Sequence, residues 1–205
     1  MRFALSALPL AAAIGLAAGP ALAQSAGDWT LSFGLGHVNP KSNNGVLAGA
    51  QASINSNTQL TLGFGYFFTD NLALDVLAAT PFRHRVSLAG LGEVATTKHL
   101  PPTVSVQYHF RNASGVTPFV GAGVNYTTFF STRGVGPLAG QTVRIKDSFG
   151  IAVQGGVDMK VSDRGAIRAD VRWINIRSDV TVNGANVGKA KIDPVVLGLS
   201  YVHRF

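Results

Sequence analysis

Apolar and polar side chains alternate along most of this chain. In residues 28–37, Trp29, Leu31, Phe33 and Leu35 fall on one side, and small or polar residues fall between them. A period of two is typical of a β-strand whose two faces meet different environments. The pattern predicts eight strands, with these approximate limits: 28–37, 58–67, 72–80, 98–110, 117–130, 144–158, 166–177 and 191–205.

The composition of the two strand faces indicates which one points outward. The face opposite the apolar residues is rich in Gly, Thr, Asn, Gln, Asp and Arg, whereas a soluble lipocalin-like barrel would bury apolar residues inside. The chain is 46% hydrophobic and 13% charged, yet after residue 23 it has no run of about 20 apolar residues, the length that a membrane helix needs. We therefore predict an all-β fold, an eight-stranded antiparallel transmembrane β-barrel with its apolar face in lipid.

Short and long connections alternate between the predicted strands. Residues 68–71, 111–116 and 159–165 are short connections, and the long ones, 38–57, 81–97, 131–143 and 178–190, are rich in Gly, Asn and Ser. Outer-membrane barrels have short periplasmic turns and long extracellular loops, so we expect both termini in the periplasm. Six apolar loop residues could form a collecting surface or pack on one another: Val46, Leu47, Leu88, Leu91, Val135 and Leu138.

Residues 1–23 are typical of a cleaved secretory signal peptide. Arg2 precedes an apolar core, and Ala21-Leu22-Ala23 forms a small-residue cleavage site. A membrane-anchoring helix is the alternative, but the apolar core is short for a span. We expect export and a single barrel domain over residues 24–205. The chain has no cysteine, which excludes disulfides and thiolate chemistry.

The formal net charge of the full chain is +7. Its basic residues are scattered through strands and loops, without the basic helix or RNA-binding signature that would favour nucleic acid. We expect them to contact outer-membrane lipid and lipopolysaccharide instead. The chain has no G-x-S-x-G or HExxH motif, and His84, between Arg83 and Arg85, is a poor metal ligand. The sequence predicts no enzyme, no cofactor and no metal site.

The last strand and a series of shorter phrases resemble known outer-membrane barrels. Tyr201 and the terminal Phe205 resemble a closing strand whose last residue is the signal for the barrel assembly machinery. The other phrases, among them Lys98-His99-Leu100-Pro101-Pro102-Thr103, resemble the outer-membrane protein W (OmpW) family, which includes alkane-uptake barrels. They cover residues 69–71, 78–84, 98–103, 118–130, 146–150, 156–158 and 192–194.

The resemblance implies an eight-stranded barrel that aids passive uptake of small, mainly hydrophobic molecules across the outer membrane. The alternative is a structural or adhesive barrel, or a phage or toxin receptor, that acts through its outer loops. The oligomeric state stays open.

Side chains can fill the lumen of an eight-stranded barrel. Acids and bases that face one another there should pair, because an unpaired buried charge is costly, and the result is either a salt-bridged plug or an ion-selective constriction. Leu77 resembles the leucine that narrows the bore in this family, but Arg172 replaces the aromatic residue expected near it, with Trp173 pointing outward. That departure argues against an apolar gate. The residues predicted to point into the lumen are Leu77, Asp75, Gln107, Gln154, Asp158, Arg168, Asp170 and Arg172.

Three prolines offer another route. Pro81, Pro101 and Pro102 fall near the outer ends of the third and fourth strands, which are neighbours. Proline donates no hydrogen bond to a β-ladder, so the wall could be interrupted there. Our hypothesis is that an apolar solute enters among the outer loops and leaves sideways through this gap. In the alternative, the prolines only end strands and shape the second long loop.

Overall fold

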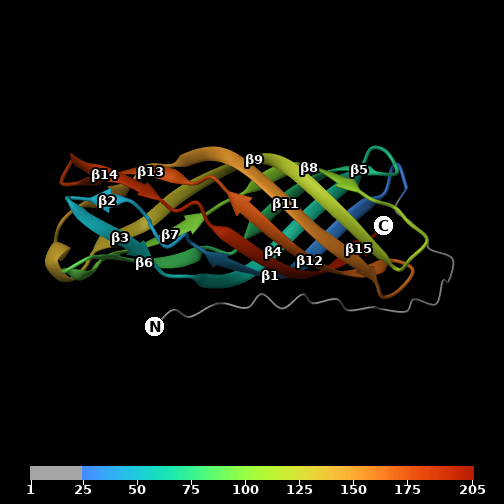
Figure 1. Cartoon of the computed structure of the whole chain (residues 1–205), viewed down its shortest axis with the longest axis horizontal. Coiled ribbons are helices and arrows are strands. Elements are labelled where there is room, and N and C mark those ends of the chain that lie inside the picture. Colours follow the sequence, from blue (N-terminus) through green and yellow to red (C-terminus); the bar gives the residue numbers. More distant parts are fainter. Residues whose placement is uncertain (1–24) are drawn as a thin grey trace, which may run out of the picture.

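The computed structural model describes residues 25–205, which form an elongated closed β-barrel (Figure 1). Eight strands make the wall, each antiparallel to its neighbours, and the pairing of β8 with β9 closes the ring. The predicted fold is confirmed, while the predicted signal peptide, residues 1–23, lies outside the described residues. The wall strands are β1 (Trp29–Asn39), β4 (Asn57–Phe67), β5 (Leu72–Ala79), β8 (Thr103–His109), β9 (Val116–Gly134), β11 (Ser148–Lys160), β12 (Gly165–Ile174) and β15 (Val195–Arg204).

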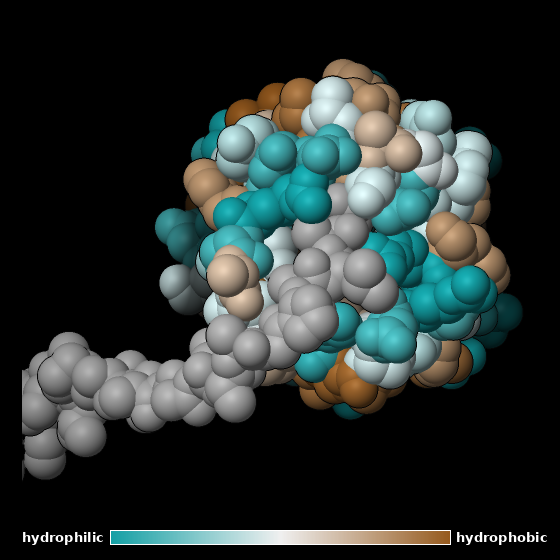
Figure 2. All heavy atoms as spheres, turned by 90° about the vertical axis from the view of Figure 1, so that its right-hand side faces the viewer, coloured by the Kyte–Doolittle hydropathy of each residue, from teal (hydrophilic) through white to brown (hydrophobic). Residues whose placement is uncertain are grey.

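The two ends of the barrel differ. At the end that we call the turn end, short connections join β4 to β5, β8 to β9 and β11 to β12, and the Phe205 amide donates to the Trp29 carbonyl. Ion pairs tie these turns, with 2.7 Å between Arg111 Nη1 and Asp70 Oδ2. Figure 2 looks at this end, where the visible described residues are mostly hydrophilic and hydrophobic ones lie on the flanks.

At the opposite end, the hairpin end, the long connections fold into β-hairpins that extend the wall. The sequence analysis predicted long loops there and no strands within them. Ala48, Gly49, Asn183 and Gly184 adopt the positive φ angles that tight hairpin turns require. The additional elements are β2 (Val46–Leu47), β3 (Ala50–Ile54), β6 (Phe82–Leu88), β7 (Gly92–Leu100), the 3₁₀ turn η1 (Gly136–Leu138), β10 (Val143–Ile145), β13 (Arg177–Val182) and β14 (Ala185–Lys191).

Several predicted strand limits were wrong for the same reason. The predicted strands 98–110, 144–158, 166–177 and 191–205 each divide in two, because a hairpin strand and a wall strand follow one another in the chain. The first divides at Pro101-Pro102 and the last at Asp193-Pro194, where Asp193 has a φ of 33°. β9 instead runs unbroken to Gly134 and belongs to both parts of the barrel.

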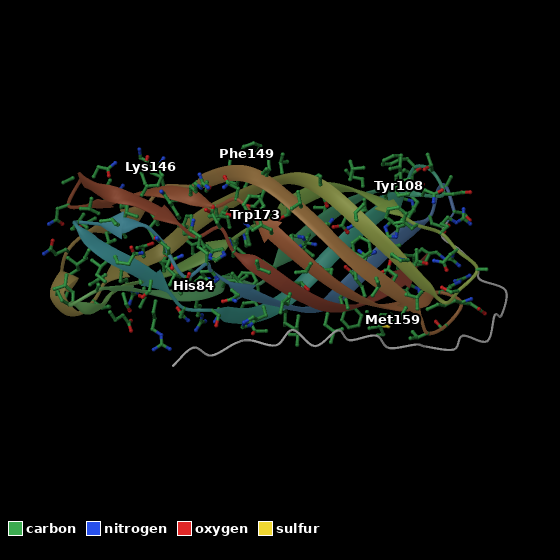
Figure 3. The ribbon with its side chains drawn as sticks, in the orientation of Figure 1. His84, Tyr108, Lys146, Phe149, Met159 and Trp173 are labelled. Atoms are coloured by element: carbon green, nitrogen blue, oxygen red, sulfur yellow. The ribbon has the colours of Figure 1, made fainter. Side chains whose placement is uncertain are left out.

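The predicted alternation of faces is confirmed in the wall. Small and polar residues point into the lumen, and glycine is required where strands crowd together, since a Cβ on Gly123 would collide with the Val104 carbonyl oxygen. No helix within residues 25–205 is long and apolar enough to span a membrane. Exposed apolar side chains form an outer belt, part of which is labelled in Figure 3, and the belt includes Phe33, Leu35, Leu60, Leu62, Phe64, Tyr108, Val124, Phe149, Ile151, Leu197 and Leu199.

Candidate functional site

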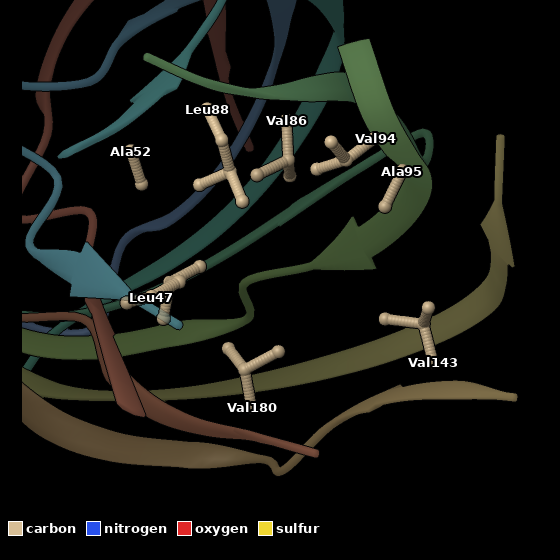
Figure 4. Close-up of a cluster of buried hydrophobic side chains, with 9 residues drawn as sticks. Leu47, Ala52, Val86, Leu88, Val94, Ala95, Val143 and Val180 are labelled. Atoms are coloured by element: carbon tan, nitrogen blue, oxygen red, sulfur yellow. The ribbon is translucent and has the colours of Figure 1, made fainter. Parts of the chain in front are cut away.

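The hairpin end encloses an apolar cavity of about 250 Å³. Its wall comes from strands distant in the sequence, because β2, β6, β7, β10, β13 and β14 each turn alternate apolar side chains toward the barrel axis. Figure 4 shows these side chains converging from opposite sides. An apolar cavity of about 150 Å³ can bind a molecule the size of benzene, so this cavity has room for a small hydrophobic solute. The buried cluster around it is Leu47, Ala52, Val86, Leu88, Val94, Ala95, Val143, Val180 and Ala190.

The predicted apolar loop residues divide into two groups. Leu47, Leu88, Leu91 and Leu138 line the cavity, and Leu91 is also exposed to solvent. Val46 is exposed and, like Val135, is not part of the lining. Leu47 and Leu88 belong to the buried cluster and Leu138 packs against it, so these three pack on one another as the second interpretation predicts.

Aromatic rings form the floor of the cavity. His84 and His99 stack with ring centroids 4.9 Å apart and planes 7° apart, and His99 also stacks on Phe82 at 5.4 Å. His84 Nδ1 lies 2.6 Å from the Asn55 carbonyl oxygen, so this nitrogen carries the proton and donates. Burial lowers the pKa of His84, and burial together with the nearby charge of His84 lowers the pKa of His99 to about 3. Both rings are therefore neutral at physiological pH.

Sequence reasoning did not find this histidine pair. It treated His84 only as an isolated residue between two arginines. The signal was present in the alternation, because His84 and His99 occupy inward positions on two strands that become a hairpin, with Phe82 opposite His99 in the register. No group of three or more His, Cys, Asp or Glu that could hold a metal ion occurs within residues 25–205.

Below this floor, polar side chains fill the lumen. Arg168 makes two short contacts with one carboxylate, 2.7 Å from Nε to Asp158 Oδ1 and 2.8 Å from Nη2 to Oδ2. Its Nη1 lies 3.8 Å from Asp75 Oδ1, and its guanidinium stands 4.5 Å over the Phe119 ring. All these side chains are buried, and ion pairs buried in this way need such complete partnering to be tolerated.

A second set of contacts lies closer to the hairpin end than the first. Arg172 donates through Nε to Gln154 Oε1 at 2.9 Å, and Gln154 Nε2 donates to Ser105 Oγ at 2.8 Å. Arg172 Nη2 lies 3.6 Å from Asp170 Oδ2. Arg172 and Asp170, together with Leu77, line a void of only about 30 Å³, roughly the share of one water molecule in liquid water. The predicted lumen residues thus lie together as a salt-bridged plug.

The plug contains a residue that was not among the predicted lumen residues. His109 is fully buried in the lumen, stacked on Phe119 at 5.1 Å, with Nε2 3.1 Å from Gln107 Oε1. Arg172 points inward, and Trp173 pairs with the belt residues Val153 and Val195 on the outer face, as predicted.

The barrel wall is interrupted beside the three prolines. The β5–β8 ladder ends at the pair Leu77–Thr103, and the β6–β7 ladder begins at Phe82–His99. Between these pairs, residues 78–81 face residues 100–102, and no ladder pair joins them in the described chain. Proline lacks the N–H that would continue the ladder.

The segments on both sides of this interruption form hydrogen bonds with other strands and not with each other. The Pro101 and Pro102 carbonyls each accept a hydrogen bond of 3.0 Å from Asn125 Nδ2 on β9. On the other side, the Thr80 amide donates to Leu60 on β4 at 2.9 Å. Asn125 is fully buried and was not predicted as a site residue, although it falls at an inward position of the fifth predicted strand.

Comparison with known proteins decides the family. A family model described as the OmpW family matches residues 25–205. This chain belongs to the OmpW family. Outer membrane protein W of Vibrio cholerae is 39% identical to it over 210 residues, which cover 96% of this chain and 97% of that protein. The family predicted from the sequence phrases is confirmed.

Two further relatives of this OmpW-family chain support the same assignment. Outer membrane protein AlkL of Ectopseudomonas oleovorans is 33% identical over 194 residues, 86% of this chain and 82% of AlkL. The crystal structure of the outer membrane protein OprG from Pseudomonas aeruginosa matches with a TM-score of 0.79 and 31% identity, over 89% of this chain and 98% of OprG. All three relatives are outer-membrane proteins, so the apolar belt of this chain is the lipid-facing surface of an outer-membrane barrel. None of the three is named as an enzyme.

Proposed function

We propose that this OmpW-family barrel aids passive uptake of small, mainly hydrophobic molecules. The observation that carries the proposal is the apolar cavity of about 250 Å³ above a lumen closed by paired charges. An apolar solute gains free energy when it leaves water for such a cavity. A polar solute loses its hydrogen bonds to water there and finds few replacements, so the cavity favours apolar solutes. The family resemblance implies the same class of solute.

We further propose that the turn end faces the periplasm and the hairpin end faces the outside. Support comes from the even number of wall strands, which brings both ends of the described chain to the turn end, and from the predicted signal peptide. The chain lacks cysteine, so single-cysteine variants can test this. A membrane-impermeant maleimide added to intact cells should label a Gly90→Cys variant and leave a Ser162→Cys variant unlabelled. The reverse labelling would refute the orientation.

For the exit we propose a lateral step into the lipid through the wall interruption beside Pro81, Pro101 and Pro102. The plug supports this, because the void beside Leu77, Asp170 and Arg172 is too small for a solute that fits the cavity. The missing ladder pairs between residues 78–81 and 100–102 also support it, since strands can separate there without breaking backbone hydrogen bonds. His99 lines the cavity and pairs with Phe82 at the edge of that break, which joins the two features.

Uptake by cells tests the proposal. A labelled small alkane or aromatic is supplied beside a small polar solute to cells with the barrel, without it, and with an Ala95→Phe variant that fills part of the cavity. The exposed Ala89→Phe, at the tip of the same hairpin, is the matched control. We expect the barrel to speed apolar uptake only, Ala95→Phe to abolish the gain and Ala89→Phe to keep it.

Other results would favour other functions. Faster polar uptake would mean that the plug opens into a water-filled pore. No effect on either solute would refute uptake and favour the alternative in which the hairpin end is an adhesive or receptor surface.

A further inference from the structure

A second hollow lies on the outer face of the hairpin end. It is a groove of about 590 Å³ that crosses β6, β7 and β9. Its arginines alternate along β6 with the buried Phe82, His84 and Val86, so they point away from the barrel axis. The residues lining it are all polar or charged: Asn55, Asn57, Arg83, His84, Arg85, Thr96, Thr97, Lys98, Ser131 and Arg133.

The pairing register sets four cations side by side in this groove. Arg83 is directly opposite Lys98, and Thr96 is opposite both Arg85 and Arg133 on its two neighbours. Like charges in directly opposed positions destabilise a sheet. A bound anion would remove that cost.

No acid supplies the missing negative charge. Elsewhere at the hairpin end cations have acidic partners, such as Lys41 with Asp193 at 2.8 Å and Lys189 with Asp179 at 3.5 Å. Within residues 25–205, none of the ion pairs involves Arg83, Arg85, Lys98 or Arg133. The one acid on these three strands, Glu93, is opposite Ser87 near the hairpin tip.

The backbone of the groove is fixed by side chains that replace missing ladder bonds. Asn57 Oδ1 accepts from the Arg83 amide at 3.3 Å, and Asn55 Oδ1 accepts from the Arg85 amide. On β9 the register shifts opposite residues 96–98, where Ser131 has a φ of 53°, and such bulges redirect side chains. The groove thus presents guanidinium and ammonium groups with a hydroxyl, donors that suit the several oxygens of a phosphate.

The height of the groove indicates the source of the phosphate. Lys98 is opposite Phe130, four residues along β9 from the exposed Tyr126 at the edge of the apolar belt. Four residues of a tilted strand rise about 10 Å, so the cations stand just beyond the acyl chains, where lipid headgroups lie. They also lie directly beyond Pro81 and Pro101, beside the wall interruption.

We propose that this groove binds the phosphate groups of a phosphorylated glycolipid of the outer leaflet, lipopolysaccharide. The proposal rests on the orientation proposed above, with the hairpin end outside. Binding can be measured in detergent, where orientation and uptake have no influence, so a failure here is distinct from a failure of the uptake proposal.

Lipid A titrated into the purified full-length barrel in detergent micelles, and followed by native mass spectrometry, tests the proposal. The test variant is Arg83→Gln with Lys98→Gln. The control is Arg144→Gln with Lys191→Gln, which removes two other exposed cations from the hairpin end. We expect the test variant to bind lipid A about a hundredfold more weakly, because it loses two charge-assisted contacts that are each worth about tenfold, and we expect the control to bind as the parent does.

Two other probes separate lipid from simple anions. Dephosphorylated lipid A should bind the parent as weakly as lipid A binds the test variant, and millimolar inorganic phosphate should not displace lipid A. Equal binding of both lipids, or an equal loss in both variants, would overturn the proposal. Displacement by inorganic phosphate would overturn the assignment to a lipid.

Discussion

The Arg168–Asp158 pair is the contact on which closure of the lower lumen most depends. Its side chains are 9% and 4% exposed, and both carboxylate oxygens accept from the guanidinium. Asp158→Asn removes the charge and leaves one acceptor in place of two. Breaking a buried ion pair by changing one partner costs about 3–5 kcal/mol when the remaining charge is left uncompensated. Arg168 keeps Asp75 at 3.8 Å, so we expect the free energy of unfolding to fall by about 3 kcal/mol, the lower end of that range.

Urea unfolding in lipid vesicles, followed by the fluorescence of Trp29 and Trp173, measures this loss. Asp163→Asn is the matched control, because its partner Lys160 is 3.5 Å away and Asp163 is 84% exposed, so the change should cost less than about 1 kcal/mol. Equal effects of the two substitutions would refute the reasoning about burial. Apolar uptake should be unchanged in Asp158→Asn barrels that fold, and a rise would show that the solute passes through the plug.

Three more changes have defined expectations. In a refolding assay, Gly123→Ala should sharply lower the yield of folded barrel, because its Cβ would meet the Val104 carbonyl and Ser105. Gly155→Ala is the control and should fold normally, because the nearest neighbour of its Cβ is 3.7 Å away. The pKa of His99 is about 3 in the folded state and about 6.5 in the unfolded state, so between pH 6.5 and pH 3 the unfolded state binds one more proton. The free energy of unfolding should therefore be full above pH 6.5 and about 2 kcal/mol lower at pH 5, and it should fall less in His99→Leu. A urea midpoint that does not change with pH would contradict this. Removal of Phe205, whose side chain is 66% exposed, should slow assembly in cells far more than it lowers the stability of the refolded barrel, and normal assembly would refute its role as the signal for the assembly machinery.

The alternation of side chains was enough to predict the barrel because lipid outside and a polar lumen inside impose opposite demands on successive residues. The same rule predicted that Asp75, Arg168 and Arg172 point into the lumen, and their side chains are buried in the structure. It could not predict which of them would pair, because Asp158 and Arg168 meet across β11 and β12 only once the register is fixed.

The hairpin end was harder to predict because its strands are short and its turns use the Gly and Asn residues that also mark irregular loops. Asn183-Gly184 is a hairpin signal that the loop prediction overlooked. The cavity itself depends on contacts between β2, β7, β10 and β13, which are distant in sequence, so no local pattern reveals it. The proline break was visible in the sequence, whereas the role of Asn125 in holding both proline carbonyls was not.

A reversible cross-link across the wall interruption tests the lateral exit most directly. Ala78→Cys with Pro102→Cys joins the outward positions just beyond the last ladder pair, and Val76→Cys with Val104→Cys, already paired on the same strands, is the control. With both disulfides fully formed, labelled apolar uptake should fall to the level of cells without the barrel only in the first variant, and a reductant should restore it. Undiminished uptake in the cross-linked first variant would contradict a route through the wall.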